Sequence, residues 1–342
     1  MADFSIRRHV DLAPYNTLGV GATAGWFVKI REIPDVARLL EAPPSRERPV
    51  HILGGGSNVL FLGDVDGIVA HVAVGGREVI ARDDRHLWLK AGAGENWHAL
   101  VRHCVEQGWG GIENLSLIPG TVGAAPIQNI GAYGAELSGV FHSLTAVNLS
   151  DGTTRTFDRE ACRFGYRDSY FKGEGRGQWL VADVTLRLSL QHEVNTGYDA
   201  LRRRLEREGI VNPDIDQVSR AVMAERRSKL PDPDDLGNAG SFFKNPVINR
   251  PRFEELRERW PGMPHYPAGE GRVKVPAGWL IEETGWKGRR VGPVGTYRQQ
   301  ALVIVNHGGA TGHEVWELAR RIRDEVAGVF GIELVPEVNI IS

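Results

Sequence analysis

The sequence predicts a soluble protein that mixes strands and helices and is divided into two or three domains. The length of 342 residues is more than a single hydrophobic core usually serves. In the first half, short strand-like segments alternate with glycine turns, whereas the segments after Asp199 are rich in Arg and Glu and have helical spacing. The segment Pro231–Asp235 interrupts both patterns, so we expect a further domain to start near it.

Strands and helices can be placed from the spacing of apolar residues. Trp179–Leu190 alternates apolar and polar side chains, which predicts a half-buried strand. Pro34–Leu40 has Pro at its start and predicts a short helix. The other predicted strands are Trp26–Ile30, Val50–Leu53, Gly67–Val72 and His86–Ala91, and the other predicted helices are Asn96–Gln107, Asp199–Glu208 and Gln217–Lys229.

The C-terminal part predicts a strand, a helix and a final strand. Ala301–Asn306 is a short apolar run typical of a buried strand. Thr311 and Glu314 form a capping-box pattern, which predicts that a helix begins there. We expect Leu334–Ile341 to be the final strand. The helix carries one apolar stripe that we assign to the core, made of Val315, Leu318, Ile322, Val326 and Phe330.

Composition and charge exclude several classes of function. The net charge is −2 and no basic block is present, so nucleic acid is not an expected partner. No apolar run is long enough to span a bilayer, and residues 1–8 lack the apolar core of a signal peptide. We therefore expect a cytoplasmic protein without a membrane partner. Cys104 and Cys162 are far apart and outside any CxxC pair, which predicts two buried thiols, no disulfide and no metal site.

Glycine is frequent and clustered. The chain has 42 glycines in 342 residues, against a usual share of about 7%, and such clusters often mark close approach of backbone to a phosphate or cofactor. Gly19–Gly25 has one residue too many for a dinucleotide fingerprint and follows no clear strand, so we reject that motif. Gly54–Asn58 does follow a predicted strand, and it fits an anion-binding nest and a plain tight turn equally well.

Two further loops carry more specific chemistry. Ile118–Gly134 consists mainly of small residues, so its backbone suits a flat pyrophosphate and an aromatic ring better than it suits a loop without a ligand. Gly237–Pro246 places a Ser, a Lys and an Asn behind two glycines, which supplies a proton donor, a cation and an amide in one tight turn. The alternative is a glycine turn that leads into a buried strand. This alternative is less favoured, because Tyr166–Ser169 and Pro336–Val338 supply the further residues that would complete one active site with this loop.

Six motifs occur together and in order, although each alone is weak. They are Asn16–Leu18, Gly54–Asn58, Pro119–Gly134, Tyr166–Ser169, Gly237–Pro246 and Pro336–Val338. With these motifs the chain closely resembles, over nearly its whole length, the UDP-N-acetylenolpyruvoylglucosamine reductases, the MurB family of peptidoglycan synthesis. Tyr198 and the helical segment before Lys229 resemble the longer form of the family, which has an extra substrate-covering element.

The resemblance implies an α+β fold. It implies an FAD-binding module of the vanillyl-alcohol-oxidase (PCMH) type in two subdomains, residues 1–75 and 76–225, and a C-terminal α/β substrate-binding domain, residues 226–330. The terminal strand, residues 331–342, would carry Glu337 back to the active site. FAD would be noncovalent, because nothing singles out a His or Cys for a covalent link. The implied FAD-binding residues are Gly54, Gly55, Gly56, Ser57, Asn58, Pro119, Gly120, Thr121, Gly123, Ala124, Gly131, Tyr133 and Gly134.

The implied reaction is the reduction of UDP-N-acetyl-3-O-(1-carboxyvinyl)-glucosamine to UDP-N-acetylmuramate. NADPH would reduce FAD, and flavin N5 would deliver a hydride to the vinyl carbon. Arg167 would stabilise the resulting enolate, because a guanidinium is always charged and grips a carboxylate at two points. Ser241 would donate the proton to the α carbon, and Glu337 would assist as a buried, protonated donor. The alternatives are a surface ion pair of Arg167 with Asp168, a serine that caps its own backbone, and a solvated strand glutamate.

The substrate-binding residues follow from the resemblance alone. They are Tyr166, Tyr198, Lys229, Asn245 and Gln300. Lys229 would place a point charge on the diphosphate, Tyr198 would close over it, and Gln300 is preferred to Gln299 by alignment only. We expect a monomer that binds a small UDP-sugar. Two alternatives remain open: another FAD-dependent sugar or alcohol oxidoreductase of the same superfamily, and a nucleotide-binding protein without activity.

Overall fold

The computed structural model describes residues 4–342, and the chain divides into two compact units. Unit 1 contains residues 4–10, 24–56 and 65–227, and unit 2 contains residues 11–23, 57–64 and 228–342. No helix within the described residues is long and apolar enough to cross a membrane. Residues 1–8 lack the apolar core of a signal peptide in their sequence, and the first three of them lie outside the described part.

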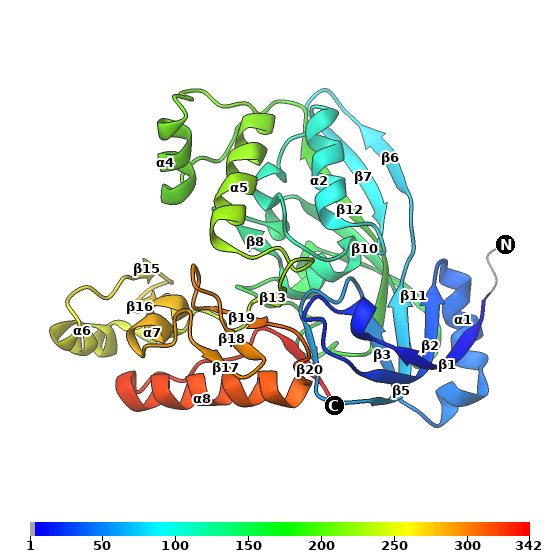
Figure 1. The fold of residues 1–342 in the computed structure, drawn as a ribbon. Coiled ribbons are helices and arrows are strands. Elements are labelled where there is room, and N and C mark those ends of the chain that lie inside the picture. Colours follow the sequence, from blue (N-terminus) through cyan, green and yellow to red (C-terminus); the bar gives the residue numbers. More distant parts are fainter. Residues whose placement is uncertain (1–3) are drawn as a thin grey trace. The chain divides into compact units, whose positions relative to one another are not determined.

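The first sheet of unit 1 has four strands in the order β1-β2-β5-β3 (Figure 1). The central strand β5 runs parallel to both β2 and β3, and helix α1 (Ile33–Glu41) makes the crossover that this arrangement requires. Val36 and Leu39 of α1 pack into the same core as Ile30 and Ile68 of the sheet. The strands are β1 (Ile6–Asp11), β2 (Thr23–Ile30), β3 (Val50–Leu53) and β5 (Val65–Val72).

The second sheet of unit 1 is antiparallel, with the strand order β11-β10-β12-β7-β6. The prediction that its central strand β12 is half-buried is wrong, because Val181, Asp183 and Thr185 are buried as well as the residues that alternate with them. The 3-10 segment η4 (Val122–Gln128) lies against β12, and Thr145 Oγ1 donates to the buried Asp183 at 3.0 Å. The strands are β6 (Arg77–Arg82), β7 (His86–Gly92), β10 (Phe141–Asn148), β11 (Thr154–Asp158) and β12 (Trp179–Ser189).

The helices of unit 1 confirm the predicted helical segments. Helix α2 (Trp97–Glu106) packs in the main core, and α4 (Asp199–Arg207) forms a small separate core with α5 (Ile215–Lys229). Burial raises the pKa of Cys104 in α2 and of Cys162 in α3 (Arg159–Cys162) to about 12, which confirms two buried, free thiols. The short elements are η1 (Ala13–Tyr15), η2 (Pro43–Arg46), η3 (Glu113–Leu115), η5 (Leu137–Gly139), β8 (Gly131–Ala132) and β9 (Ala135–Glu136).

Unit 2 is built on an antiparallel sheet in the order β13-β19-β18-β17 and a smaller sheet in the order β14-β16-β15. A short parallel pair joins β4 and β20. The helices are α6 (Arg250–Arg259), α7 (Ala277–Glu283) and α8 (Gly312–Phe330). The strands are β4 (Val59–Phe61), β13 (Gly237–Ser241), β14 (Val247–Asn249), β15 (Tyr266–Pro267), β16 (Arg272–Lys274), β17 (Arg290–Val291), β18 (Val294–Thr296), β19 (Val303–Asn306) and β20 (Asn339–Ile341).

Helix α8 confirms both predictions made for it. Thr311 and Glu314 make both hydrogen bonds of the capping box, and Gly331 ends the helix in the left-handed conformation. The stripe from Val315 to Phe330 is buried with the sheet of unit 2. The apolar stripe of α8 is therefore core.

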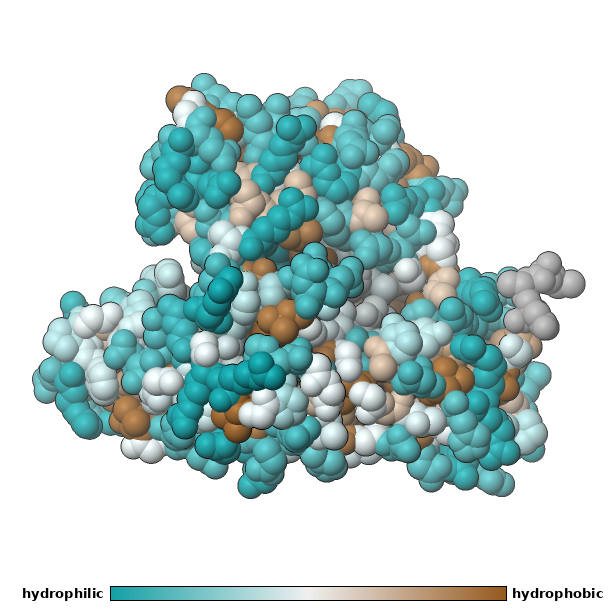
Figure 2. Space-filling view, in the orientation of Figure 1, coloured by the Kyte–Doolittle hydropathy of each residue, from teal (hydrophilic) through white to brown (hydrophobic). Residues whose placement is uncertain are grey.

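On the face shown in Figure 2, hydrophilic residues cover most of the surface and hydrophobic ones lie in small groups.

The final strand is shorter than predicted. Only Asn339–Ile341 forms β20, whereas the residues around Pro336 make a single bridge to Phe243. Glu337 N donates to Phe242 O and Lys244 N donates to Val335 O, so the N atom of Pro336 takes no part in this bridge and proline is tolerated there. Similarly, β19 starts at Val303 and not at Ala301, because Val303 N donates to Gln300 O and closes a turn there.

Candidate active site

The glycine turn after β3 is pressed against the segment that leads into η4. A Cβ atom on Gly54 would lie 2.8 Å from Thr121 Oγ1, and a Cβ atom on Gly55 would lie 2.9 Å from Gly120 Cα. Gly120 has a φ of +107°, which residues with a side chain rarely adopt. The two segments therefore meet through their backbones, and side chains at Gly54 and Gly55 would fill the surface that they form.

Thr121 gives an independent sign that this surface accepts a ligand. Its Oγ1 is buried and has no hydrogen-bond partner within residues 4–342. A buried polar group without a partner costs about 1–3 kcal/mol, which a polar atom of a bound group would recover. The bare glycine backbone and this hydroxyl together fit FAD, which presents a pyrophosphate and the polar edges of its rings.

Gly123 has a different reason to be glycine. Its N–H donates to Ala93 O at 2.8 Å, and a Cβ atom on it would lie 2.5 Å from Ala93 Cβ. This close approach fixes the start of η4 beside the end of β7. Ala124, in contrast, is 3.4 Å from the position of a Gly54 Cβ and belongs to the surface described above. Gly123 thus positions the segment that leads into η4, whereas Gly120, Thr121 and Ala124 line the surface formed with Gly54 and Gly55.

Strained backbone concentrates in the same region of unit 1. Six non-glycine residues in the described chain have a positive φ, and four of them lie on the predicted cofactor and catalytic segments or next to them. Such residues are uncommon and cluster at functional sites, where the surroundings must hold them in place. The four are Leu117 (+58°), Asn129 (+43°), Tyr133 (+49°) and Arg167 (+52°).

Arg167 lies at the tip of a tight turn and points back to the loop 129–131. Gly165 and Asp168 close the turn with two backbone hydrogen bonds. Arg167 Nη2 donates to Gly131 O at 2.5 Å, and Nη1 lies 3.5 Å from Asn129 O. Carbonyl oxygens orient a guanidinium without neutralising its charge, so these contacts leave it able to attract an anion.

Asn129 ties the Arg167 turn to this loop. Its buried side chain donates to Gly165 O at 3.1 Å and to Glu136 Oε2 at 2.9 Å, and it accepts from Ser138 N at 3.0 Å. Asparagine tolerates the left-handed conformation better than most residues do. The bond to Gly165 O therefore ties Asn129 to the Arg167 turn, and the other two bonds hold Asn129 within its own loop.

The structure brings Tyr198 next to Tyr133 of the predicted FAD loop. The two rings meet edge to face, with centroids 5.3 Å apart, and Tyr198 is 42% exposed at the N-terminus of α4. Burial raises the pKa of Tyr133 to about 12, so its hydroxyl stays protonated. The buried Asn114 donates both to Tyr133 O and to Asn195 O, at 2.9 and 2.8 Å, and joins the two segments. An exposed ring at this place can cover a ligand that lies on the loop.

Arg226 of α5 is a candidate that the sequence analysis missed. Burial lowers its pKa, as does the positive charge of Arg167 nearby. Its Nε donates to Leu117 O at 3.2 Å, and it makes no ion pair with a carboxylate of the described residues. Two neighbouring guanidinium groups favour an anionic ligand. The sequence signal that could have identified Arg226 is the group of three positive residues Arg226, Arg227 and Lys229. Helical spacing alone, however, places such residues on the solvent-exposed face of a helix.

Ser241 ends β13 of unit 2 after an irregular pairing with β19. Gly240 has a φ of +65° and its N–H donates to Asn238 Oδ1 at 2.9 Å. Asn238 also donates to Pro231 O and Leu236 O, at 3.2 and 2.9 Å. Phe242 and Phe243 beyond it are buried, so the bulge presents a half-buried Ser241 at the edge of a rigid core.

Glu337 lies on the segment that runs beside Ser241 and its neighbours. Glu337 N donates to Phe242 O at 2.8 Å, and Asn58 Nδ2 donates to Glu337 O at 3.3 Å. Asn58 in turn accepts from Asn339 N at 3.0 Å. Unit 2 thus brings together Asn58, Ser241 and Glu337, which lie far apart in the sequence.

Asn245 and Gln300 meet at the first turn of α7. Ala277 N donates to Asn245 Oδ1 at 2.8 Å, and Gln300 Oε1 lies 2.6 Å from the position of a Gly278 Cβ. The amide oxygen of Asn245 therefore faces the helix backbone, whereas that of Gln300 lies beside Gly278 and accepts from Leu302 N at 3.3 Å. Gln299 differs, because its Oε1 accepts from Tyr297 Oη at 3.1 Å in an exposed position.

The predicted site residues thus form two groups, one in each unit. Lys229 is the last residue of α5 and is half-buried, and Tyr166 is 37% exposed beside Arg167. Unit 1 holds Gly54, Gly55, Gly56, Pro119, Gly120, Thr121, Gly123, Ala124, Gly131, Tyr133, Gly134, Tyr166, Arg167 and Tyr198. Unit 2 holds Ser57, Asn58, Lys229, Ser241, Asn245, Gln300 and Glu337.

Comparisons with known proteins agree with this division. Residues 25–158 match the family described as FAD binding domain. Residues 232–341 match the family described as UDP-N-acetylenolpyruvoylglucosamine reductase, C-terminal domain. The fold and the glycine surface of unit 1 therefore define a flavin-dependent oxidoreductase, and the predicted α+β fold class and FAD cofactor are confirmed.

Relatives that match along the whole chain define the family. A UDP-N-acetylenolpyruvoylglucosamine reductase from Pseudomonas aeruginosa is 50% identical over 98% of both chains, and one from Chromobacterium violaceum is 49% identical over 97% of both. The crystal structure of a UDP-N-acetylenolpyruvylglucosamine reductase (MurB) from Thermus caldophilus is 27% identical, covers 99% of this chain and all of its own, and has a TM-score of 0.67. The chain belongs to the UDP-N-acetylenolpyruvoylglucosamine reductase family, as the sequence motifs predict.

Proposed function

We propose that this protein reduces the enolpyruvyl group of UDP-N-acetylenolpyruvoylglucosamine, with NADPH as reductant, in the synthesis of peptidoglycan precursors. The observation that carries the proposal is 50% identity, over 98% of both chains, to a reductase named for that substrate. Arg167 and Arg226, two neighbouring guanidinium groups in unit 1, suit a substrate that has a carboxylate and a diphosphate.

FAD would supply the hydride chemistry when it is bound. The backbone of Gly54–Gly56 and of Gly120–Thr121 would hold it, with Thr121 Oγ1 as a hydrogen-bonding group. Pro119, Gly131, Tyr133 and Gly134 continue the same loop, and Ser57 and Asn58 follow the glycine turn. The loop needs no covalent attachment, because it offers a matching surface and a partner for a polar atom.

Arg167 would bind the substrate carboxylate and stabilise the negative charge that develops on it. The hydrogen bonds from Arg167 to the carbonyl oxygens of the loop orient the group before the substrate arrives. Preorganised charge of this kind usually makes the largest single contribution to catalysis. Ser241 would give the proton to the α carbon, and Glu337 would assist this transfer as a hydrogen-bonding or protonated carboxyl.

The nucleotide part of the substrate would be bound by amides, a lysine and aromatic rings. The amide oxygens of Asn245 and Gln300 accept from Ala277 N and Leu302 N, and their NH₂ groups would donate to diphosphate oxygens. Lys229 adds positive charge, while Tyr198 and Tyr166 supply exposed rings.

The remaining expectations complete the proposal. The FAD module would occupy residues 1–75 and 76–225, the substrate domain residues 226–330, and the last segment residues 331–342. The protein would act in the cytoplasm as a monomer, without nucleic acid or membrane partners. Sedimentation at micromolar concentration tests the monomer, and a dimer at that concentration would overturn it.

A single cuvette tests the activity. Under anaerobic conditions NADPH should bleach the flavin band, and UDP-N-acetylenolpyruvoylglucosamine should restore it. Bleaching without recovery would discard the substrate and keep the flavoprotein, and no flavin band after addition of FAD would discard both. The variant Ser241→Ala should keep its bleaching by NADPH but recover about 10²- to 10⁴-fold more slowly, which is the usual contribution of a general acid. Unchanged recovery would exclude Ser241 as the acid.

A further inference from the structure

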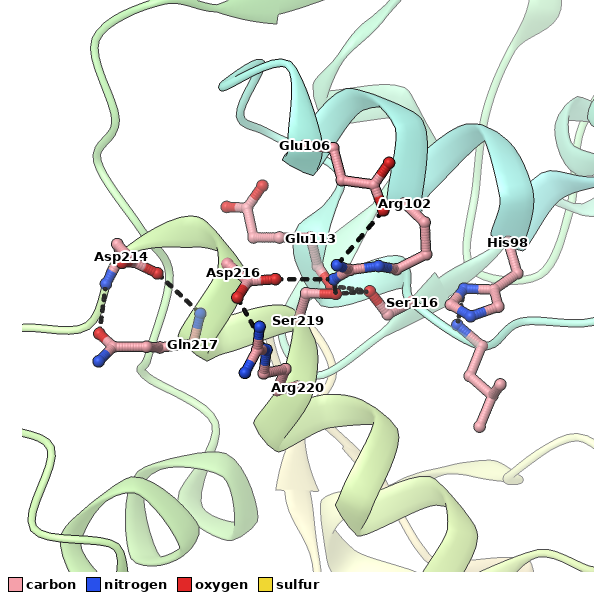
Figure 3. A network of polar contacts seen from close by, with 11 residues as sticks. His98, Arg102, Glu106, Glu113, Ser116, Asp214, Asp216, Gln217, Ser219 and Arg220 are labelled. Carbon is pink, nitrogen blue, oxygen red and sulfur yellow. Dashed lines mark hydrogen bonds and ion pairs between the residues drawn. The ribbon is translucent and has the colours of Figure 1, made fainter.

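His98 accepts a hydrogen bond from Leu117, the residue directly before the predicted FAD loop. It is the second residue of α2, and its Nδ1 lies 2.9 Å from Leu117 N (Figure 3). A backbone N–H can only donate, so Nδ1 must accept and cannot carry a proton. The imidazole is therefore neutral, with its proton on Nε2.

Leu117 requires such a hold because its φ is +58°. A residue with a branched side chain adopts the left-handed region only when its surroundings impose it. The two peptide groups of Leu117 are both anchored, since its N–H donates to His98 and its O accepts from Arg226 Nε at 3.2 Å. The direction in which Ile118–Thr121 leave this point depends on these two contacts.

A directed chain of hydrogen bonds locks α2 to α5 beside this point (Figure 3). Ser116 Oγ donates to Glu113 O at 2.7 Å, so it must accept from Ser219 Oγ, which lies 2.8 Å away. Ser219 Oγ in turn accepts from Arg102 Nη1 at 2.9 Å, and Arg102 pairs with Asp216 at 3.0 Å. Both serines are fully buried. The helices that carry His98 and Arg226 are thus fixed relative to each other and to the residue before Leu117.

We infer that His98 is a positioning residue for the flavin-binding loop, because its neutral imidazole holds Leu117 in the left-handed conformation. That conformation directs Ile118–Thr121 to the cofactor and gives Arg226 its carbonyl anchor. The inference rests on the FAD-binding role proposed above for this loop. It assigns His98 no contact with cofactor or substrate.

Burial and nearby positive charges keep His98 neutral. Arg102 lies on its own helix, and Arg226 and Arg227 face it from α5. Burial lowers the pKa of His98, and these three positive charges lower it further. The contact with Leu117 is thus complete above the ordinary histidine pKa of about 6.5. It is lost as the pH falls from there through the lower pKa of the folded state, where a proton on Nδ1 displaces the Leu117 N–H.

Nuclear magnetic resonance of the FAD-free protein tests the contact itself. With ¹⁵N-labelled histidine, His98 should show Nε2 protonated and Nδ1 unprotonated at pH 7.5, and should titrate below an exposed histidine. A proton on Nδ1 at pH 7.5 would overturn the inference. This result does not depend on FAD, substrate or turnover.

Titration of the FAD-free protein with FAD tests the consequence. His98→Ala should weaken FAD binding about tenfold, the value of about one hydrogen bond. His98→Asn keeps an oxygen near the position of Nδ1 and should restore most of the affinity, without the loss of affinity at acid pH that we expect of the wild type. The control is His103→Asn, on the same helix, where the ring packs on Trp109 and not on the loop. It should bind FAD as the wild type does.

The outcomes separate this inference from the proposed function. Equal FAD affinity of the wild type and His98→Ala would overturn the inference and leave the function intact. Equally weak binding by His98→Ala and His98→Asn would also overturn it, because a neutral acceptor would then not suffice. No FAD binding by the wild type would overturn the proposed function, and with it the role of His98 in the loop.

Discussion

Asn129 connects the turn that carries Arg167 to the loop 129–131, and its replacement tests whether this amide positions the guanidinium. Two substitutions separate its contributions. Asn129→Gly removes the side-chain hydrogen bonds but keeps a residue that accepts a φ of +43°. Asn129→Ala removes the same bonds and adds the strain of a Cβ atom in the left-handed region.

The magnitude follows from the contacts. The side chain makes three hydrogen bonds, to Glu136, to Gly165 and from Ser138. Only the bond to Gly165 O joins Asn129 to the turn, so at about 1 kcal/mol its loss lowers the free energy of opening the turn by about that amount in Asn129→Gly. The left-handed strain adds about 1 kcal/mol in Asn129→Ala. Since about 1.4 kcal/mol is a factor of ten, opening should become about fivefold easier in the first variant and about fivefold easier again in the second.

Amide hydrogen exchange at Gly165 and Asp168 measures this opening directly, because each N–H donates to the carbonyl of the other residue. The control is Asn238→Ala in unit 2. Asn238 also makes three side-chain hydrogen bonds, but around Ser241. It should leave exchange at Gly165 and Asp168 unchanged. Unaltered exchange in both Asn129 variants, or an equal effect of Asn238→Ala, would refute the reasoning.

Two further predictions concern the glycine surface and the thiols. Gly54→Ala should weaken FAD binding at least tenfold without loss of circular dichroism, because its Cβ would lie 2.8 Å from Thr121 Oγ1 and fill the surface. Normal affinity in a titration would show that FAD does not lie there. Cys104 and Cys162, which have pKa values of about 12, should not react with a thiol reagent at pH 8 in the native protein, whereas both should react in guanidinium chloride. Rapid reaction of either thiol in the native state would contradict its burial.

Local patterns predicted most elements of the fold, because the features that define them lie within a few residues. The capping box at Thr311 and the stripe from Val315 to Phe330 specify α8 completely. The errors arose where distant segments decide the outcome. Strand β12 alternates like a half-buried strand, yet residues on both of its faces are buried and η4 lies against it. The final strand is shorter because only Asn339–Ile341 pairs with β4, whereas Pro336 makes a single bridge to Phe243.

The site was predictable only in part, for a similar reason. Glycines and reactive side chains in ordered motifs are visible in a sequence, and these motifs correctly predicted the family to which the chain belongs. Arg226 and His98 are not visible, because ordinary helical residues surround them and their role depends on Leu117, which lies far from Arg226 in the chain. Gly123 shows the opposite case. It lies inside a recognisable motif, but its contact with Ala93 gives it a structural reason to be glycine.

The supporting groups around the two arginines are mostly uncharged, and this has an electrostatic reason. Asn129, Asn114 and the neutral His98 hold strained loops through amide and imidazole groups, and Arg226 is anchored by a carbonyl oxygen. A carboxylate in the place of that carbonyl would bind Arg226 more strongly, but it would also cancel the charge that an anionic cofactor and substrate need. Neutral groups thus fix the geometry around these arginines without adding a negative charge of their own. Burial lowers the pKa of Arg226, and the positive charge of Arg167 lowers it further, so an anionic ligand would stabilise the charged form.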